Sequence, residues 1–290
     1  MSLSKKVRKD IISSIKQKNK AIVLTVGNYK GGAGKTSNTV LIAYELAKKG
    51  LKTLVIDLDP QSNATKCLLL TKSGLYPDEV VTIDKTLMTG IAEKKIDGLE
   101  VQIMDNLFLL PSYIDFEDFP KFLYKTTNTK EEEDYYIKNI FDPLEVKYDI
   151  ILIDVPPMSK AVTRNAVICS DYVLISLQTH ERSLSGAENY VQELNSLNLE
   201  YDLDLEVVGV LPVLHKNNGS VDKYIMKTAT ETFGKENLFD IVIPQMERIK
   251  RFDVNGITEK DRYDEKVISF FNNVSDELLE RIHYFETQEK

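Results

Sequence analysis

The sequence predicts an α/β fold in which a mostly parallel, doubly wound sheet is flanked by helices on both faces. Two observations predict this class. Short apolar runs typical of buried strands alternate with segments of helical length along the chain. Three of these runs end in polar residues, at the sheet edge where parallel sheets bind ligands. Because no linker interrupts the alternation, we expect a single domain over residues 21–290, and a hydrophobic content of 42% is ample for its core.

The first 20 residues predict a basic amphipathic helix ahead of that domain. They contain seven Lys or Arg against one acidic residue, although the whole chain has a net charge of −8. Val7, Ile11 and Ile15 fall on one face of such a helix. A helix of this kind can bind DNA, a membrane surface or a protein groove, or it can dock on its own domain. The residues leave these possibilities open.

A glycine-rich stretch, GNYKGGAGKTS over residues 27–37, lies between an apolar strand over 21–26 and a helix over 38–47. Glycines let successive backbone N–H groups turn toward an anion, and the helix N-terminus adds partial positive charge. Lys35 would reach the β- and γ-phosphates of a nucleotide, Thr36 would ligate Mg²⁺ and Ser37 could donate to the α-phosphate. The expected phosphate cradle consists of Gly31, Gly32, Ala33, Gly34, Lys35, Thr36 and Ser37.

Carboxylates end two further apolar strands. The strand over residues 52–58 runs into Asp57 and Asp59, which point to opposite faces if the backbone is still extended there. One of them could brace the Mg²⁺ shell while the other faces an attacking water. The strand over 148–157 ends in Asp154, where two prolines prevent it from continuing, and Asp154 is placed to hold the metal. The expected metal residues are Thr36, Asp57 and Asp154.

The remaining segments complete the alternation. We expect short helices over 83–91, 115–124 and 131–146, and short strands over 100–104 and 107–110. Further along, we expect strands over 172–177, 206–211 and 239–243, helices over 183–197 and 219–233, and a closing amphipathic helix over 262–286.

The cysteines and the hydropathy of the sequence indicate the cellular compartment of the protein. Cys67 and Cys169 lie far apart without a C-x-x-C motif, and neither a signal peptide nor an apolar run of membrane-spanning length is visible. These features predict a cytoplasmic protein without a membrane span.

Three motifs, KGGAGKTS, DLDPQSNAT and DVPP, resemble those of the deviant Walker ATPases, and within them the ParA-type DNA-partition ATPases. Tyr29 stands where a strict P-loop has glycine, and Lys30 is a second lysine beside the cradle. The resemblance implies that Lys30 crosses a dimer interface to the partner's nucleotide, so that Lys30, Lys35 and Asp59 are catalytic, with Asp59 orienting the water. The segment IPQMERIKR is similar to one that, in the family, lines the adenine and faces nucleic acid; this implies adenine contacts at Pro244 and Met246 and DNA contacts at Arg248, Lys250 and Arg251.

The function implied by the resemblance is an ATP-driven switch. ATP and Mg²⁺ would assemble a homodimer, the dimer would bind duplex DNA without sequence preference, and hydrolysis, stimulated by a centromere-binding partner, would release it. The ATP-bound form would then be associated with the bacterial nucleoid. Because the chain is acidic, DNA binding must come from a local basic patch that outweighs the net charge.

Two alternatives remain from the sequence. One is a MinD-like positioning ATPase of the same fold that acts on a membrane or a protein array; the many acids of the last helix weigh against the membrane. The other is a small-molecule ligase similar to dethiobiotin synthetase, which Lys30 and the DLDPQ string disfavour.

Overall fold

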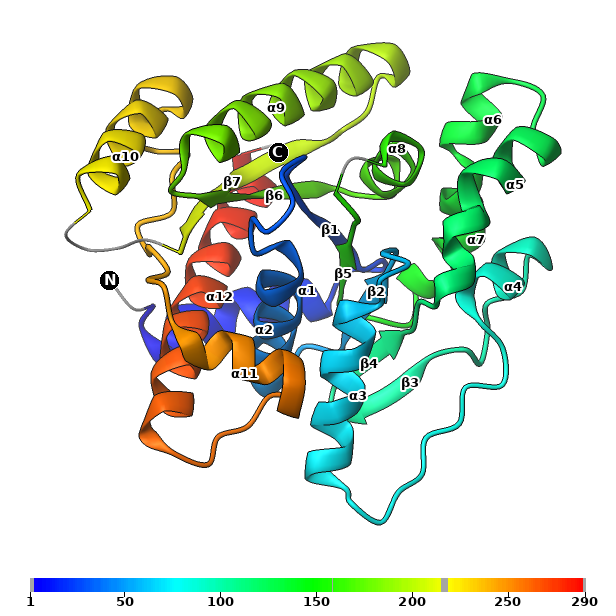
Figure 1. The fold of residues 1–290 in the computed structure, drawn as a ribbon, viewed down its shortest axis with the longest axis horizontal. Helices are drawn as coiled ribbons and strands as arrows, with labels where there is room; N and C mark the ends of the chain where they lie inside the picture. Colours follow the sequence, from blue (N-terminus) through cyan, green and yellow to red (C-terminus); the bar gives the residue numbers. More distant parts are fainter. Residues whose placement is uncertain (1–2, 158, 215–218, 289–290) are drawn as a thin grey trace.

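The computed structural model describes residues 3–157, 159–214 and 219–288, and a seven-stranded sheet forms its centre (Figure 1). The strand order is β3-β4-β2-β5-β1-β6-β7; β3 pairs antiparallel with β4, and the other pairs are parallel. The expected mostly parallel sheet is therefore confirmed. The strands are β1 (Ile22–Gly27), β2 (Thr53–Asp57), β3 (Val101–Met104), β4 (Leu107–Leu110), β5 (Ile150–Asp154), β6 (Tyr172–Gln178) and β7 (Glu206–Val213).

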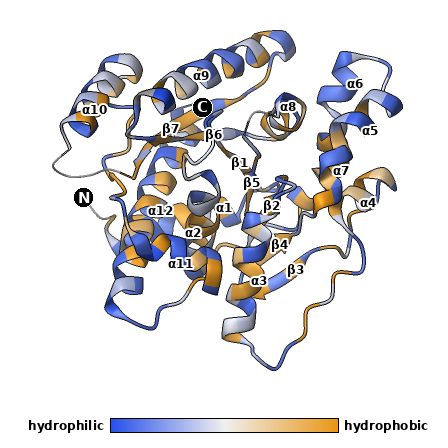
Figure 2. Cartoon of the chain, in the orientation of Figure 1, coloured by the Kyte–Doolittle hydropathy of each residue, from blue (hydrophilic) through white to orange (hydrophobic). Residues whose placement is uncertain are grey.

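Helices cover both faces of this sheet, as expected for a doubly wound fold. One face carries α1 (Lys5–Lys16), α2 (Lys35–Lys48), α3 (Asn63–Leu75), α11 (Glu247–Asn255) and α12 (Arg262–Gln288). The other carries α4 (Leu87–Ala92), the 3₁₀ turn η1 (Ile114–Asp118), α5 (Phe119–Thr126), α6 (Lys130–Asp134), α7 (Tyr136–Glu145), α8 (Lys160–Ile168), α9 (Glu181–Tyr201) and α10 (Ser220–Phe233). Figure 2 shows the apolar residues gathered along the strands and on the helix faces that cover them.

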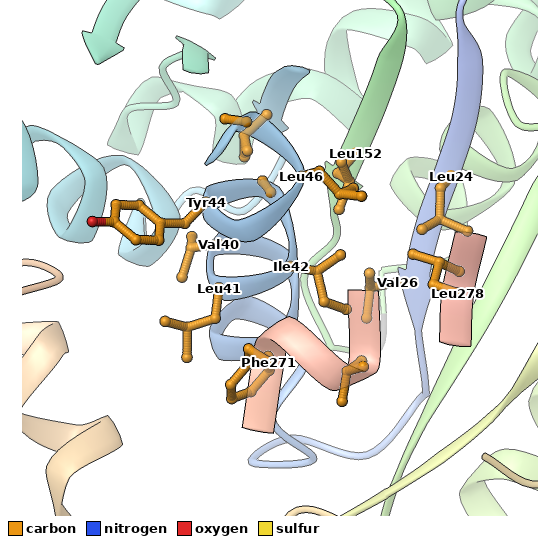
Figure 3. Packing of buried hydrophobic residues seen from close by; sticks show 14 of the residues in the cluster. Leu24, Val26, Val40, Leu41, Ile42, Tyr44, Leu46, Leu152, Phe271 and Leu278 are labelled. Atoms are coloured by element: carbon orange, nitrogen blue, oxygen red, sulfur yellow. The ribbon is translucent and has the colours of Figure 1, made fainter. Parts of the chain in front are cut away.

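Helix α2 is buried on nearly every side. This helix lies between the sheet and α12, and its side chains contact both layers (Figure 3). Ile42 lies near Val26 of β1, and Leu41 lies near Phe271 of α12. The burial of α2 on two sides holds the helix that begins at Lys35 firmly beneath the glycine-rich loop.

The N-terminal basic helix docks on its own domain. Ile11 and Ile15 are buried in the same hydrophobic core as α2 and α12. Arg8 forms an ion pair with the buried Asp276 of α12, and Lys18 pairs with Glu286. Of the possibilities left open by the sequence, docking is the one that the structure shows.

The expected strand over residues 239–243 is wrong. Leu238 makes a parallel bridge to Val210, and the Ile243 N–H donates to the Pro212 carbonyl of β7 at 2.9 Å, but no continuous ladder joins these two points. Side chains of α12 take the backbone groups that a strand would need: the Glu277 carboxylate accepts from two successive N–H groups, and the Arg281 guanidinium donates to the Leu238 carbonyl. Burial of the apolar residues here does not require a strand.

Three helix predictions need new boundaries. The helix expected over 83–91 begins at Leu87, because the Thr86 hydroxyl caps it. The helix expected over 115–124 is a 3₁₀ turn followed by α5, and the one over 131–146 is divided at Tyr135 into α6 and α7. Within the described ranges, none of the helices combines the length and apolar character needed to cross a membrane.

Candidate nucleotide-binding site

The glycine-rich loop lies at the carboxyl edge of the sheet, between β1 and α2. Gly32 and Gly34 have φ values of 73° and 81°, a region that favours glycine, and Gly34 precedes the first turn of α2. All of the expected cradle residues, 31–37, line one cleft of about 470 Å³. The structure therefore brings the expected cradle residues together at the N-terminus of α2, and phosphate binding by them stays a prediction.

Lys35 supplies positive charge to this cleft. Its side chain is buried, and its ammonium donates to the Lys30 carbonyl at 3.2 Å. Burial lowers the pKa of Lys35, while the nearby Asp154 and Asp59 carboxylates act in the opposite direction. A partly desolvated ammonium beside an open cleft can form strong charge-assisted hydrogen bonds to phosphate oxygens.

Asp154 and Thr36 form the oxygen donor set. The Thr36 hydroxyl donates to Asp154 Oδ2 at 2.8 Å, and the Thr39 hydroxyl contacts Oδ1 at 3.4 Å. Asp154 is fully buried; burial and the charge of Asp57 raise its pKa well above the ordinary value. Two buried carboxylates side by side with a hydroxyl suit a hard divalent cation, which would offset their charge. The residues present therefore fit Mg²⁺.

Asp57 lies beside Asp154 at the strand ends, and its carboxylate also accepts hydrogen bonds from the turn that follows. It pairs in register with Asp154, and burial raises its pKa to about 6. Its Oδ2 accepts from both the N–H and the hydroxyl of Thr65, and its Oδ1 accepts from the Asp59 N–H. Because β2 ends at Asp57, strand alternation does not extend to Asp59. In this structure Asp57 anchors the turn that carries Asp59, and Asp59 lines the cleft.

The two expected adenine contacts differ in position. Met246, just before α11, lines the cleft with Leu214 and Ile249, whereas Pro244 is not among the lining residues. The apolar side chains at this end of the cleft offer a surface for a nucleobase.

The expected DNA patch does not form one free basic surface. Arg248 is paired with Asp261 and with the buried Asp264. Lys250 pairs with Glu247 and lines the nucleotide cleft. Arg251 is exposed and, together with the exposed Lys266 of α12, lines a second cavity of about 440 Å³.

Three polar residues that support the loop were missed at the sequence level. The Ser176 hydroxyl donates to the Ala33 carbonyl and accepts from Asn38 Nδ2 at 2.8 Å. Asn28 bonds the backbone on either side of the loop base. The available signal was a serine inside the apolar strand YVLISLQ, because a buried polar residue needs a partner.

Comparison with known proteins agrees with this geometry. The fold and the loop define a P-loop ATPase, and a sequence profile described as an AAA domain matches residues 21–207, more than half of the chain. An uncharacterized protein of Methanocaldococcus jannaschii is 32% identical over 193 residues, covering 66% of this chain and 72% of that protein. The chromosome-partitioning ATPase Soj of Treponema pallidum is 28% identical over 232 residues, covering 79% and 85%. The chain belongs to the AAA-domain family and, within it, to the ParA-type partition ATPases.

Solved structures show the same fold. A Cyanothece McdA variant in complex with ATP has a TM-score of 0.77 at 19% identity and covers 92% of this chain and 98% of that one. A putative plasmid partition protein of Borrelia burgdorferi bound to AMPPNP has a TM-score of 0.69 at 23% identity, covering 91% and 99%. Cobyrinic acid a,c-diamide synthase of Mycobacterium smegmatis with ADP and magnesium has a TM-score of 0.67 at 22% identity, covering 84% and 91%. Proteins of this fold thus bind nucleotide, in one case with magnesium.

Proposed function

We propose that this chain is an ATP-dependent partition ATPase that binds Mg²⁺-ATP in the cleft at the carboxyl edge of the sheet. The observation that carries the proposal is that residues from three segments meet: Lys35, Thr36 and Asp59 line one cleft, and the buried Asp154 accepts a hydrogen bond from Thr36 just behind it. Lys35 would hold the β- and γ-phosphates, Thr36 and Asp154 would hold the metal, and Asp59 would orient the attacking water. Mg²⁺ would neutralise phosphate charge and the buried carboxylates.

The assignment of Lys35 and Asp59 is tested by separating binding from hydrolysis. Lys35→Ala removes a charged donor, so ATP affinity should fall about 10- to 100-fold. Asp59→Ala should bind ATP with normal affinity and hydrolyse it slowly, because it removes no phosphate contact. Nucleotide titration and a phosphate-release assay measure the two effects. Hydrolysis at the parental rate in Asp59→Ala would show that another group orients the water.

A homodimer explains the second lysine. Lys35 already serves the phosphates of its own subunit, and Lys30 is half-buried at the base of the loop. We propose that Lys30 reaches the nucleotide of a second copy. Lys30→Ala should then bind ATP nearly normally and fail to dimerise with a non-hydrolysable analogue, as measured by sedimentation. A normal dimer of this variant would refute the role of Lys30.

For DNA, the structure shifts the proposal toward Arg251. Since Arg248 and Lys250 have carboxylate partners, the proposed phosphate contacts are Arg251 and its cavity neighbour Lys266. Each contact adds about 0.9 to the slope of log affinity against log salt, so removing both should flatten the slope by about 1.8 per copy. Lys121→Ala, an exposed lysine on α5, is the matched control.

The outcome of that experiment also separates the alternatives. An unchanged salt slope in the double variant would place the DNA surface elsewhere. If the ATP-bound parent does not bind DNA at low salt, a protein array becomes the better candidate surface. A centromere-binding protein that accelerates ATP hydrolysis, and location in the cytoplasm with nucleoid association in the ATP-bound form, complete the proposed cycle.

A further inference from the structure

The side chain of Asn28 holds the backbone at Lys30. The Lys30 N–H donates to Asn28 Oδ1 at 2.8 Å. Asn28 Nδ2 in turn donates to the Ser176 carbonyl at 2.8 Å and, more weakly, to the Ser183 carbonyl at 3.4 Å. The side chain is almost fully buried. Because two carbonyls face the nitrogen and an N–H faces the oxygen, only one orientation of the amide satisfies all three groups.

Helix α9 closes over the same contact. A Cβ atom on Gly186 would lie 2.9 Å from Asn28 Oδ1 and 3.4 Å from Lys30 Cβ, so the helix approaches at a distance that only glycine allows without a shift. One turn further on, Tyr190 packs edge to face against Tyr29, with ring centroids 5.2 Å apart. The base of the loop is therefore seated on α9 just before the flexible glycines begin.

We propose that Asn28 is a positioning residue for Lys30, and that Gly186 provides the space for this contact. The inference rests on the proposed function, in which Lys30 reaches a nucleotide bound by a second copy. Fixing the Lys30 backbone limits the conformations from which its side chain can reach a second copy, and preorganisation of this kind reduces the entropy lost on association. Lys35 lies beyond the glycines on α2 and meets this contact only through the Lys30 carbonyl, at 3.2 Å, so we expect nucleotide binding within one subunit to depend less on Asn28 than dimerisation does.

The test compares Asn28→Ala, Lys30→Ala and the double variant. Losing one buried hydrogen bond of ordinary strength corresponds to about a tenfold change in an equilibrium constant. We expect Asn28→Ala to weaken analogue-dependent dimerisation by about tenfold or more and to slow hydrolysis, while ATP affinity stays within about threefold. The double variant should be no worse than Lys30→Ala, because residues that act as one unit are not additive.

Gly186→Ala provides a second, independent perturbation. The added methyl group presses on the Asn28–Lys30 contact, whereas alanine itself favours a helix. This variant should stay folded, with some loss of thermal stability because the buried Asn28 amide must shift, and it should lose dimerisation. Gly74→Ala in α3 is the matched control, because a Cβ there meets no atom within 4 Å, and it should dimerise normally.

The outcomes are distinguishable. If Lys30→Ala dimerises and hydrolyses ATP normally, the proposed role of Lys30 fails and this inference fails with it. If Lys30→Ala is defective while folded Asn28→Ala and Gly186→Ala are normal, only the positioning role is overturned. A loss of ATP affinity in Asn28→Ala as large as that in Lys35→Ala would also overturn it, since Asn28 would then be supporting the whole cradle.

Discussion

Arg164 on α8 joins three helices through one buried ionic cluster, and its removal should be costly. Its guanidinium donates to the fully buried Asp134 of α6 at 3.0 and 2.5 Å. It also contacts Glu193 and Glu200 of α9, at 3.0 and 2.8 Å. Tyr201 donates its hydroxyl to the same Asp134 oxygen at 2.7 Å. Arg164 therefore supplies two of the charge-assisted hydrogen bonds that offset the buried negative charge of Asp134.

Arg164→Met keeps the aliphatic stem and removes the charge. Breaking a buried pair by deleting one partner typically costs about 3–5 kcal/mol; because Tyr201 and Lys130 remain on Asp134, we expect a loss of about 3 kcal/mol in the free energy of unfolding. Arg164→Met/Asp134→Asn should recover part of that loss, since no buried charge is then unpaired. Arg182→Met, an exposed arginine on α9, is the matched control and should change little.

The pH dependence of the free energy of unfolding provides a second test of this ionic cluster. Burial pushes the pKa of Asp134 upward, but hydrogen bonds from Arg164, Tyr201 and Lys130 outweigh it, so the pKa lies below its ordinary value. A carboxyl group whose pKa is lower in the folded than in the unfolded state stabilises the fold at pH values above the unfolded-state pKa. This stability is lost as the pH falls through the folded-state pKa. Without Arg164, only Tyr201 and Lys130 oppose the effect of burial, so the pKa of Asp134 should rise and the deficit of Arg164→Met should narrow as the pH falls from 7 to 5. Urea denaturation at both pH values measures this, and a loss below about 1 kcal/mol at pH 7 would refute the reasoning.

Three further substitutions test the packing around the site. Gly27→Ala would place a Cβ 2.2–2.3 Å from the Tyr190 ring and hydroxyl, so we expect lower thermal stability and impaired ATP binding; unchanged melting and ATP affinity would contradict this clash. Tyr190→Phe removes a buried hydroxyl that has no hydrogen-bond partner among the described residues, so the free energy of unfolding should stay constant or rise by about 1 kcal/mol, and a clear loss in chemical denaturation would reveal a missing partner. Ile11→Ala should cost about 2–4 kcal/mol in the same assay because the side chain is buried in the core, whereas an unaffected protein would mean that α1 is undocked in solution.

The parts of the site that could be predicted from sequence are local. The strand, glycines, Lys35 and Thr36 are contiguous, so their order alone places the cradle at a helix N-terminus. Asp154 could be placed because the carboxyl ends of parallel strands meet at one edge, and the register confirms that it lies opposite Val26 and Asp57.

The parts that could not be predicted depend on distant partners. Asn28 and Gly186 meet only after the sheet has formed, and neither belongs to a motif that would pair them. Arg248 was expected to face DNA because its segment resembles the nucleic-acid face of the family. Its acidic partners, Asp261 and Asp264, lie beyond the end of α11 and could not be assigned to it from the sequence. Docking of α1 requires Asp276, which is 268 residues away from Arg8. In each case a long-range contact decides what a locally ambiguous side chain does.

The segment that replaces the expected last strand has a consequence for self-association. β7 is an outer strand of the sheet, and unpaired strand edges are templates for aggregation. Residues around Leu238 cover that edge with one bridge, and Glu277 and Arg281 occupy backbone groups of the covering segment, so it cannot recruit another strand there. At the opposite edge, β3 has four residues and an irregular register with β4, which makes a poor template. Both edges of the sheet are thereby guarded against strand pairing with other copies, so the proposed nucleotide-controlled dimer would not compete with association through the sheet.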